Sequence, residues 1–296
     1  MKIAVSGSRG LVGSALLPLL ERASHEVHRL VRGIPAGDDI GWDLKTGEIE
    51  HEKLAGLDAV VHLAGEGIAE GRWTAAKKAR IRDSRVNGTR LVCEGLAKLE
   101  RKPSVLVCAS AIGYYGDRGD EKCDESAPPG VGFLPDVCTA WEDATLPAVH
   151  AGIRVVNLRI GVVLSTRGGA LSKMLLHFKL GLGGIVGDGK QYWSWISLDD
   201  VVQATVHCID ADGIRGPVNG VAPNAVTNRE FTKTLGRVLR RPTLFPMPAF
   251  AARLALGETA DALLLCSAHV VPHVLQESGF QFQHEDLESA LMQLLR

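Results

Sequence analysis

Three glycines stand at three-residue intervals near the start of the chain, in the segment Gly7-Ser8-Arg9-Gly10-Leu11-Val12-Gly13. Gly7 permits a tight turn with positive φ, Gly10 lets the backbone approach a pyrophosphate, and Gly13 lets a helix pack closely on a strand. The unpaired amides at the start of that helix would bind the phosphate groups. The spacing therefore predicts a dinucleotide site built from residues 7–13, with a tight turn that binds nothing as the alternative.

Two arginines indicate which dinucleotide this site would take. An NAD site usually carries Asp or Glu about 20 residues after the glycines, where it binds the ribose 2′-hydroxyl. Here Arg32 occupies that place, and Arg9 lies in the glycine turn itself. Two guanidinium groups suit a 2′-phosphate through charge-assisted hydrogen bonds. We therefore expect NADP(H) rather than NAD(H); the alternative for each arginine is a solvated surface charge.

Strands and helices must position these residues. Short β-branched segments alternate with amphipathic stretches of helical length, which is typical of a parallel sheet covered by crossover helices. We predict an α/β fold of the Rossmann type with a doubly wound parallel sheet. The predicted strands are Lys2–Ser6, Glu26–Val31, Asp58–Leu63, Ser104–Ala109 and Arg154–Ile160. The predicted helices are Leu11–Ala23, Thr74–Leu99 and Val137–His150, the last broken by Pro147.

The second half of the chain has a different composition, with frequent glycines followed by prolines. Glycines are frequent from Gly168 to Lys190, which favours loops within a smaller substrate-side region of about residues 165–200. Ser197, with Asp200 three residues later, predicts a capping box that opens a helix. Prolines after residue 241 and the amphipathic stretch Glu285–Leu295 predict a C-terminal helical module. We place the nucleotide-binding domain at residues 1–245 and the module at residues 246–296.

Composition excludes several classes of function. The 33 Lys and Arg residues balance 34 Asp and Glu residues, so the chain lacks the positive charge that nucleic acid binding requires. No apolar run approaches the roughly 18 residues of a membrane span, and no secretory signal precedes the first strand. The six cysteines contain no C-x-x-C pair, and the histidines lack metal-ligand spacing. We expect a cytoplasmic protein with reduced cysteines and with no metal, nucleic acid or membrane partner.

Further motifs run along most of the chain. The glycine spacing, together with Val60-Val61-His62-Leu63-Ala64-Gly65, Arg85-Val86-Asn87-Gly88-Thr89 and Arg159–Leu164, resembles the extended short-chain dehydrogenase/reductases, the nucleotide-sugar epimerase and dehydratase group. Gly71-Arg72-Trp73, Gly113-Tyr114-Tyr115-Gly116 and Trp141-Glu142 resemble, more narrowly, one atypical subfamily of epimerase-family proteins. Some of its members are described as cell-division inhibitors, and they end in a small C-terminal domain of unknown function. The resemblance implies that Leu63, Ala64, Gly65, Arg85 and Val163 also line the cofactor.

The pair of residues that the resemblance leads us to expect for catalysis is absent. Redox members of the superfamily use Tyr-x-x-x-Lys, in which the lysine lowers the pKa of the tyrosine that passes a proton. None of the three tyrosines here has a lysine four residues later. Alignment by distance from the preceding strand places Cys138 at the tyrosine position and Glu142 at the lysine position. A neighbouring carboxylate raises a thiol's pKa, so we expect Cys138 to be a packed residue rather than a nucleophile.

The remaining polar residues leave the reaction open. We expect hydride transfer to or from a small polar, sugar-like substrate, with Ser110 and either Tyr114 or Tyr115 polarising a carbonyl. Both phenols could equally be packing residues, and Glu66 could be a substrate acceptor or a simple loop carboxylate. The aromatic run Tyr192–Trp195 could cover a ligand or anchor the core. The alternative function is a dinucleotide-binding regulator or scaffold without turnover, and a homodimer is the candidate assembly.

Overall fold

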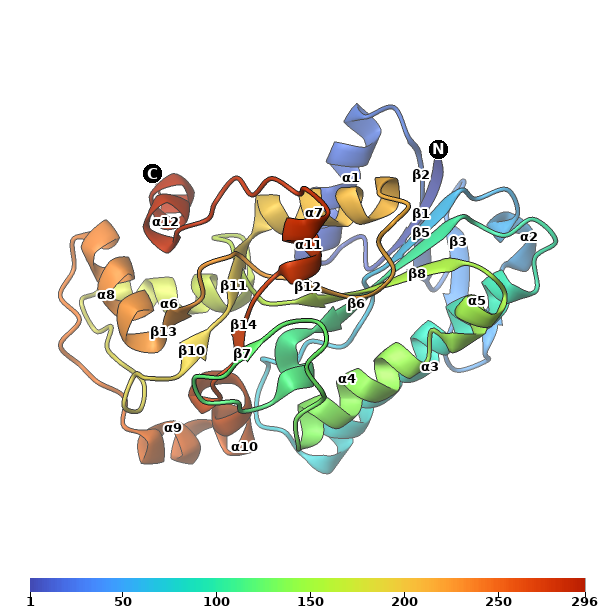
Figure 1. Cartoon of the computed structure of the whole chain (residues 1–296). Helices are drawn as coiled ribbons and strands as arrows, with labels where there is room; N and C mark the ends of the chain where they lie inside the picture. Colours follow the sequence, from blue (N-terminus) through green and yellow to red (C-terminus); the bar gives the residue numbers. More distant parts are fainter. Residues whose placement is uncertain (296) are drawn as a thin grey trace.

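An eight-stranded sheet forms the centre of the molecule (Figure 1). The structure is a computed structural model and describes residues 1–295. Neighbouring strands run parallel except at one edge, where β4 is antiparallel to β3. The order across the sheet is β12 (Gly216–Gly220), β8 (Arg154–Ile160), β6 (Val105–Ala111), β5 (Ala59–His62), β1 (Lys2–Ser6), β2 (Glu26–Arg32), β3 (Ile40–Asp43) and β4 (Glu48–Ile49).

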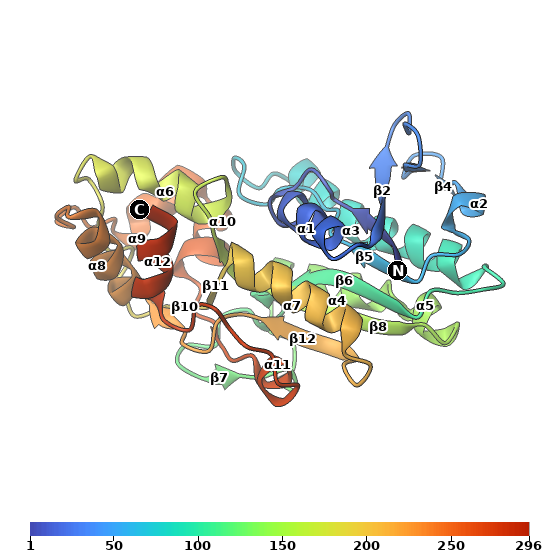
Figure 2. The same cartoon turned by 90° about the horizontal axis from the view of Figure 1, so that it is seen from above.

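Helices cover both faces of this sheet, because successive residues of its central strands are apolar on opposite sides. Ile3 and Val5 of β1 belong to one buried cluster with α1 (Leu11–Arg22) and α7 (Leu198–Asp210). Ala4, between them, belongs to a second cluster with α3 (Ala75–Ala97). Figure 2 looks onto the α1 and α7 side. The second face also carries α2 (His51–Leu54), α4 (Phe133–Asp143) and α5 (Leu146–His150).

A smaller helical region lies beyond the carboxyl ends of the strands, on the left of Figure 1. Its core is formed by α6 (Gly169–Lys179), α8 (Asn228–Leu239) and α12 (Leu287–Leu295), which pack around buried Trp193 and Trp195. Short strand pairs connect it to the rest: β9 (Val162–Leu164) with β11 (Trp195–Ser197), β10 (Tyr192–Trp193) with β13 (Val226–Thr227), and β14 (His269–Val270) with β7 (Lys122–Cys123). The remaining helices are η1 (Ile112–Tyr115), α9 (Ala249–Leu256), α10 (Glu258–Ala260), η2 (Asp261–Leu265) and α11 (His273–Glu277).

The predicted α/β fold with a doubly wound, mostly parallel sheet is confirmed. The strands predicted at Lys2–Ser6 and Arg154–Ile160 have these bounds in the structure, and the other three differ by one or two residues at their ends. The helix predicted at Val137–His150 is two helices, α4 and α5. Pro147 lies in the first turn of α5, where a missing N–H costs nothing.

Two expectations were wrong in detail, and two strands were not predicted. The glycine-rich span contains the helix α6, because Leu171, Leu175 and Phe178 bury one side of it. Strands β3 and β4 were not predicted. The capping box at Ser197 is only half formed: Ser197 Oγ accepts from the amide of Asp200 at 2.9 Å. The Asp200 carboxylate accepts from the hydroxyl of Ser197 at 2.8 Å and from the amides of residues 283 and 284, so it binds the C-terminal segment to the main domain.

No helix in the described part of the chain is both long enough and apolar enough to cross a lipid bilayer.

Candidate cofactor and substrate site

The glycine turn has the geometry that its spacing predicts. Gly7 has φ +67°, and a Cβ there would lie 2.7 Å from the carbonyl carbon of Leu63, the residue that follows the neighbouring strand β5. A Cβ on Gly13 would lie 2.3 Å from the Gly7 oxygen, so only glycine lets α1 approach the turn this closely. Helix α1 begins after Gly10 without a side-chain cap. Its first amides are therefore not used by a capping side chain, and they can bind phosphate oxygens.

Ser6 fastens the turn to the end of β5. Its Oγ accepts hydrogen bonds from the amides of Leu63 at 3.0 Å and Ala64 at 3.2 Å, and it lies 2.8 Å from Nδ1 of His62. Since the oxygen accepts both amide protons, its own proton is directed to Nδ1. Burial lowers the pKa of His62 to about 4, which keeps the imidazole neutral and able to accept that proton. Sequence reasoning missed both Ser6 and His62.

Arg9 follows the end of β1, and Arg32 is the last residue of the adjacent strand β2, which pairs with β1 in parallel. Both side chains are exposed. Within residues 1–295, neither guanidinium forms a hydrogen bond or an ion pair. A surface arginine on a folded domain often finds a carboxylate, so two unpaired ones beside the glycine turn are available to an anion.

A second helix begins beside the same turn. A Cβ on Gly169, the first residue of α6, would lie 3.3 Å from Cδ2 of Leu11 and 3.4 Å from the oxygen of Val163. Val163 is on β9, paired with Ile196 of β11. The structure therefore brings Val163 and Leu11 together, as the cofactor prediction requires, and it adds the start of α6, which the sequence did not indicate.

Arg85 holds the loop that follows β5. Its Nη1 donates to the carbonyl oxygens of Glu66 at 2.9 Å and Ile81 at 3.1 Å. Its guanidinium lies against Gly65, where a Cβ would be 3.3 Å from Cζ, and 4.9 Å above the ring of Trp141. Burial lowers the pKa of Arg85. This side chain is therefore not the exposed helix charge that was one alternative for it; it is packed beside the predicted cofactor contact Gly65.

Glu66 itself is held on α3. Its carboxylate accepts a hydrogen bond from Nζ of Lys77 at 2.8 Å, and its amide donates to Oγ of Ser84 at 3.0 Å. The side chain of Lys77 is only 8% exposed. The bond from Lys77 lowers the pKa of Glu66, although burial opposes the shift. The loop after β5 is thus fixed at both its backbone and its side chain.

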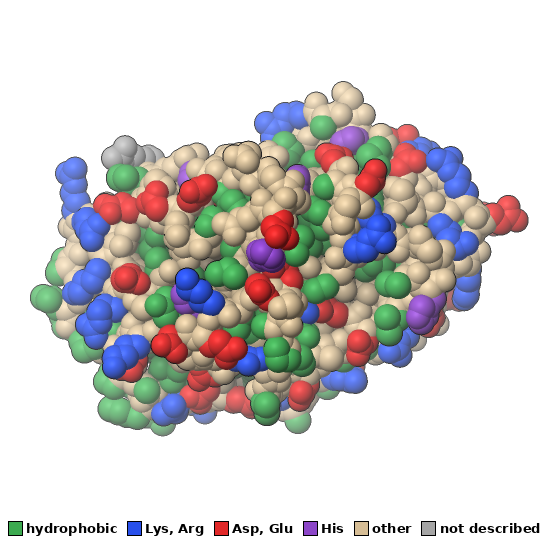
Figure 3. Space-filling view, in the orientation of Figure 1, with side chains coloured by type: hydrophobic (Ala, Val, Ile, Leu, Met, Phe, Trp, Pro, Cys, Tyr) green, Lys and Arg blue, Asp and Glu red, His purple; other side chains and the backbone are tan. Residues whose placement is uncertain are grey.

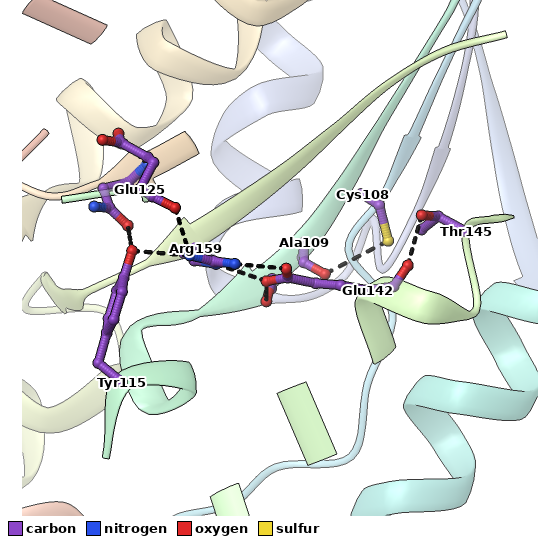
Figure 4. Close-up of polar contacts among 9 residues, drawn as sticks. Cys108, Ala109, Tyr115, Glu125, Glu142, Thr145 and Arg159 are labelled. Atoms are coloured by element: carbon purple, nitrogen blue, oxygen red, sulfur yellow. Dashed lines mark hydrogen bonds and ion pairs between the residues drawn. The ribbon is translucent and has the colours of Figure 1, made fainter. Parts of the chain in front are cut away.

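A buried polar network lies next to the position of the missing tyrosine (Figure 4). Glu142 accepts two hydrogen bonds from Arg159, from Nε and from Nη2, both at 2.8 Å. Ser110 Oγ donates to the same carboxylate at 2.7 Å. On the other side, Arg159 Nη1 donates to the hydroxyl of Tyr115 at 3.0 Å, and that hydroxyl donates to Asn219 Oδ1 at 2.7 Å. The protons of both Ser110 and Tyr115 therefore have partners inside the protein.

The network continues into the C-terminal segment. Oε1 of Glu125 accepts from the amides of Asn219 at 2.9 Å and Val274 at 3.2 Å. Burial raises the pKa of Glu125. Burial also raises the pKa of Tyr115 to about 12, and this side chain is fully buried. A phenol with this pKa and no exposure is poorly suited to exchange a proton with a ligand.

Tyr114 and Cys138 have different environments from Tyr115. Tyr114 is only partly buried, and Cζ of Arg159 lies 3.5 Å from the centre of its ring, a cation–π contact. Cys138 is 3% exposed. Burial raises the pKa of its thiol to about 12, and Glu142 adds to the shift. Burial is the larger cause, whereas the sequence pointed only to the carboxylate.

A cavity of about 320 Å³ lies where the segments 113–117 and 131–135 meet the C-terminal module. Aromatic and apolar side chains form much of its wall, and three carboxylates and one arginine add charge. Its lining includes Trp73, Gly113, Asp117, Phe133, Leu134, Arg253, Glu258, Asp261 and Cys266. A Cβ on Gly113 would lie 3.8 Å from Sγ of Cys138. Gly113, which lines the cavity, therefore lies next to Cys138, the position where redox members of the superfamily carry their tyrosine.

The aromatic run at residues 192–195 anchors the core. Trp195 is fully buried and donates from Nε1 to the oxygen of Asn224 at 3.0 Å. Trp193 packs on Phe231 with ring centres 5.2 Å apart. Tyr192 stacks on a histidine, His269, with ring centres 4.1 Å apart. These contacts show that the aromatic run packs in the core, which was one of its two interpretations, rather than covering a ligand.

Comparison with known proteins agrees with this geometry. Residues 3–219 match the NAD dependent epimerase/dehydratase family, and residues 247–294 match a domain of unknown function, DUF1731. An epimerase family protein of Mycobacterium bovis, Mb2239, is 44% identical over 98% of this chain and 96% of its own length.

Two solved structures are similar over the whole chain. The crystal structure of the human epimerase family protein SDR39U1 with NADPH has a TM-score of 0.91 and 33% identity, and it covers 99% of both chains. A nucleoside-diphosphate sugar epimerase from Corynebacterium glutamicum has a TM-score of 0.83 and 37% identity, covering 100% of this chain and 58% of its own. The chain therefore belongs to the NAD dependent epimerase/dehydratase family and is similar to the SDR39U1 proteins, with the DUF1731 domain at its C-terminus.

Proposed function

We propose that this chain binds NADPH through the glycine turn at residues 7–13 and transfers a hydride to a small polar substrate. The observation that carries the proposal is that Arg9, in the turn, and Arg32, at the end of the adjacent strand β2, form no ion pair within residues 1–295, next to a helix that starts without a side-chain cap. The turn has no room for side chains at Gly7 and Gly13, which leaves its backbone open to a pyrophosphate. The human relative with NADPH supports the same nucleotide.

The residues of the chain have separable roles in this proposal. The first amides of α1 bind the pyrophosphate, and Arg9 and Arg32 bind the 2′-phosphate by charge-assisted hydrogen bonds. Arg85, by holding the Gly65–Glu66 backbone, positions the strand end against which the nicotinamide half would lie. When bound, NADPH supplies the hydride. The chain must then hold the substrate and supply a proton.

Tyr114 is the best placed of the three proton-donor candidates. Ser110 and Tyr115 already donate their protons to Glu142 and Asn219, so neither is free to polarise a carbonyl. Tyr114 keeps partial exposure, its ring lies against the guanidinium of Arg159, and the preceding residue, Gly113, lines the cavity. We propose Tyr114 as the proton donor, with Ser110 and Tyr115 as positioning residues.

The cavity indicates the class of substrate. Aromatic walls at Trp73 and Phe133 suit the apolar face of a sugar ring, and the carboxylates of Asp117, Glu258 and Asp261 suit its hydroxyl groups. A relative with 37% identity is named as a nucleoside-diphosphate sugar epimerase, which supports the same class. We therefore propose a sugar or sugar nucleotide as the substrate.

A regulator or scaffold that binds NADPH without turnover is the second candidate. It is favoured by the arrangement around Glu142, where a buried ion pair replaces the Tyr-Lys pair and the protons of Ser110 and Tyr115 have internal partners. In that case the dinucleotide would stabilise one conformation of the chain rather than react.

The two candidates are separated by measuring NADPH oxidation at 340 nm with a panel of keto-sugars and sugar nucleotides. The hydride-transfer proposal expects turnover that Tyr114→Phe lowers by a factor of about 10²–10⁴, the usual contribution of one acid–base group. Tyr192→Phe, which alters a phenol whose ring stacks on His269 rather than on Arg159, is the matched control and should keep the wild-type rate. Turnover by wild type that Tyr114→Phe leaves unchanged would remove Tyr114 from the mechanism. Tight NADPH binding without turnover of any substrate would favour the regulator.

A further inference from the structure

A group of large apolar side chains is exposed on the helical region, away from the sheet. They lie on α6 and just after it, on the segment that precedes α9, and on α9 itself. Phe250 and Leu254, on α9, are 72% and 75% exposed. We call this surface the α6–α9 apolar face; it comprises Leu176, Leu180, Leu182, Leu244, Phe245, Met247, Phe250 and Leu254. Monomeric proteins seldom expose so many large apolar side chains in one place unless they contact a partner.

Backbone contacts hold this face together although its parts are about 70 residues apart in the sequence. The amide of Phe245 donates to the oxygen of Gly183 at 3.4 Å, and the amide of Met247 donates to the oxygen of Ile185 at 2.8 Å. Nε of Arg241 donates to the oxygen of Lys179 at 2.9 Å. The segment 241–248 therefore runs along the segment 179–187, and their apolar side chains share one surface.

Helix α9 is one-sided. Phe250 and Leu254 are four residues apart and so lie on the same side of the helix, whereas Ala252 is fully buried on the other. The exposed side chains are longer than the buried one, and they protrude. In Figure 3 hydrophobic side chains gather at the lower left, where Figure 1 places α9, with Lys and Arg side chains along the left edge above them.

The two segments that carry the face are rich in positive charge, although the chain as a whole has a net charge of −1. The acidic residues that directly follow α9, Glu258 and Asp261, are paired with Lys78 and Arg253. Residues 166–190 and 228–256 contain ten Lys and Arg but only two acidic residues, Asp188 and Glu230. Arg237 and Arg253 pair with carboxylates from elsewhere in the chain. Within residues 1–295 the other eight cations form no ion pair; they are Arg167, Lys173, Lys179, Lys190, Arg229, Lys233, Arg240 and Arg241. A partner of this surface must therefore be anionic and must accept apolar side chains.

We propose that the α6–α9 apolar face binds the surface of a lipid bilayer that contains anionic phospholipid. Protruding Phe and Leu side chains enter the boundary between headgroups and acyl chains, while the surrounding Lys and Arg side chains contact lipid phosphates. A second copy of this chain fits less well, because a symmetric contact would bring the two positive surfaces together. The sequence led us to expect no membrane partner because no spanning segment is present, but adsorption to a surface requires none.

Co-flotation of the full-length protein with lipid vesicles tests the proposal. We expect binding to phosphatidylcholine vesicles with about 30% phosphatidylglycerol, weaker binding in ~0.5 M NaCl, and little binding to pure phosphatidylcholine. Phe250→Asp with Leu254→Asp should lower the bound fraction about tenfold or more. Lys179→Gln with Arg240→Gln should weaken binding and reduce its dependence on salt. Val149→Asp, at an exposed apolar position on α5, should bind like wild type.

The opposite results are equally clear. Absence of wild-type binding to anionic vesicles, or an equal loss with Val149→Asp, would overturn the proposal. Equal binding to both kinds of vesicle would overturn its electrostatic part. Sedimentation velocity tests whether a second copy of this chain covers the face instead. If wild type is a dimer that does not bind vesicles, and Phe250→Asp with Leu254→Asp makes it a monomer, the face is a contact between two copies. Circular dichroism of each variant shows that it is folded.

Discussion

Arg159 forms a two-point ion pair with Glu142 in the interior of the protein, through Nε and Nη2 at 2.8 Å each. The two side chains are only 3% and 13% exposed. Glu142, on α4, occupies the position where redox members of the superfamily carry a lysine. The cation that pairs with it, Arg159, comes from strand β8. The pair connects Ser110 to Tyr115, so four side chains are ordered by one network. Redox relatives have a lysine here whose charge activates a tyrosine, whereas this chain has an ion pair with no net charge.

Removing one member of this pair should be more harmful than removing both. Glu142→Leu leaves the guanidinium of Arg159 buried without its counter-charge, and we expect it to lower the free energy of unfolding by about 3–5 kcal/mol. Glu142→Leu combined with Arg159→Met should recover a large part of that loss, because no uncompensated charge remains. Urea unfolding followed by circular dichroism measures both. A double variant that is less stable than Glu142→Leu would contradict the account.

The glycine turn should tolerate no side chain at Gly13. In Gly13→Ala the Cβ would meet the Gly7 oxygen at 2.3 Å, and backbone atoms cannot move aside as a flexible side chain can. We expect a loss of about 2 kcal/mol or more in the free energy of unfolding, with loss of dinucleotide binding. The matched control is Gly213→Ala, where a Cβ meets nothing within 4 Å; its stability should stay within about 1 kcal/mol of wild type. Equal stability of the two variants would argue against close packing in the turn.

Stability should fall in mildly acidic solution because of His62. Its pKa is about 4 in the folded protein, below the ordinary value of 6.5. As pH falls from about 6.5 to 4, the unfolded chain binds a proton that the folded chain does not, so the free energy of unfolding decreases by up to about 3 kcal/mol. His62→Asn, which keeps an acceptor for Ser6 but does not titrate, should show a smaller decrease over this window. Parallel pH curves for wild type and His62→Asn would show that His62 makes no such contribution.

Cys138 should be chemically inert while the protein is folded. Its thiol is buried and has a pKa of about 12, so almost no thiolate is present at neutral pH. We expect iodoacetamide to leave Cys138 unmodified in the native protein and to alkylate it in urea, as measured by mass spectrometry of its peptide. Cys266 is the internal comparison: burial raises the pKa of its thiol to about 12 as well, but the residue is partly exposed at the cavity, so the two thiols differ in access rather than in ionisation. Native-state alkylation of Cys138 faster than of Cys266 would restore it as a candidate nucleophile.

The parts of the site that the sequence predicted are those that depend on neighbouring residues. The turn at residues 7–13, the strand before it and the helix after it are encoded within a short segment, and the structure agrees with the prediction there. Strand β3 was missed because Ile40–Asp43 is short, and its burial depends on contacts with α3 and β2 rather than on an alternating pattern.

The parts that could not be predicted depend on partners far apart in the sequence. Ser6 and His62 are 56 residues apart, and Tyr115 and Asn219 are 104 apart. Nothing near Ser110 or Tyr115 shows that its proton already has an acceptor. The absence of a Tyr-x-x-x-Lys pair can be read from the sequence alone. The Arg159–Glu142 pair cannot, because it forms only when the fold brings β8 next to α4.

The most direct test of the account is calorimetric titration of nucleotide-free protein with NADPH and with NADH, for wild type, Arg32→Ala and Arg29→Ala. Arg29 is also exposed on β2 and is the matched control. We predict that wild type and Arg29→Ala bind NADPH at least about tenfold more tightly than NADH, since a charge-assisted bond contributes about 1.5–3 kcal/mol. Arg32→Ala should lose that preference and keep its affinity for NADH. Equal losses for both nucleotides in Arg32→Ala, or no binding of NADPH by wild type, would contradict the account.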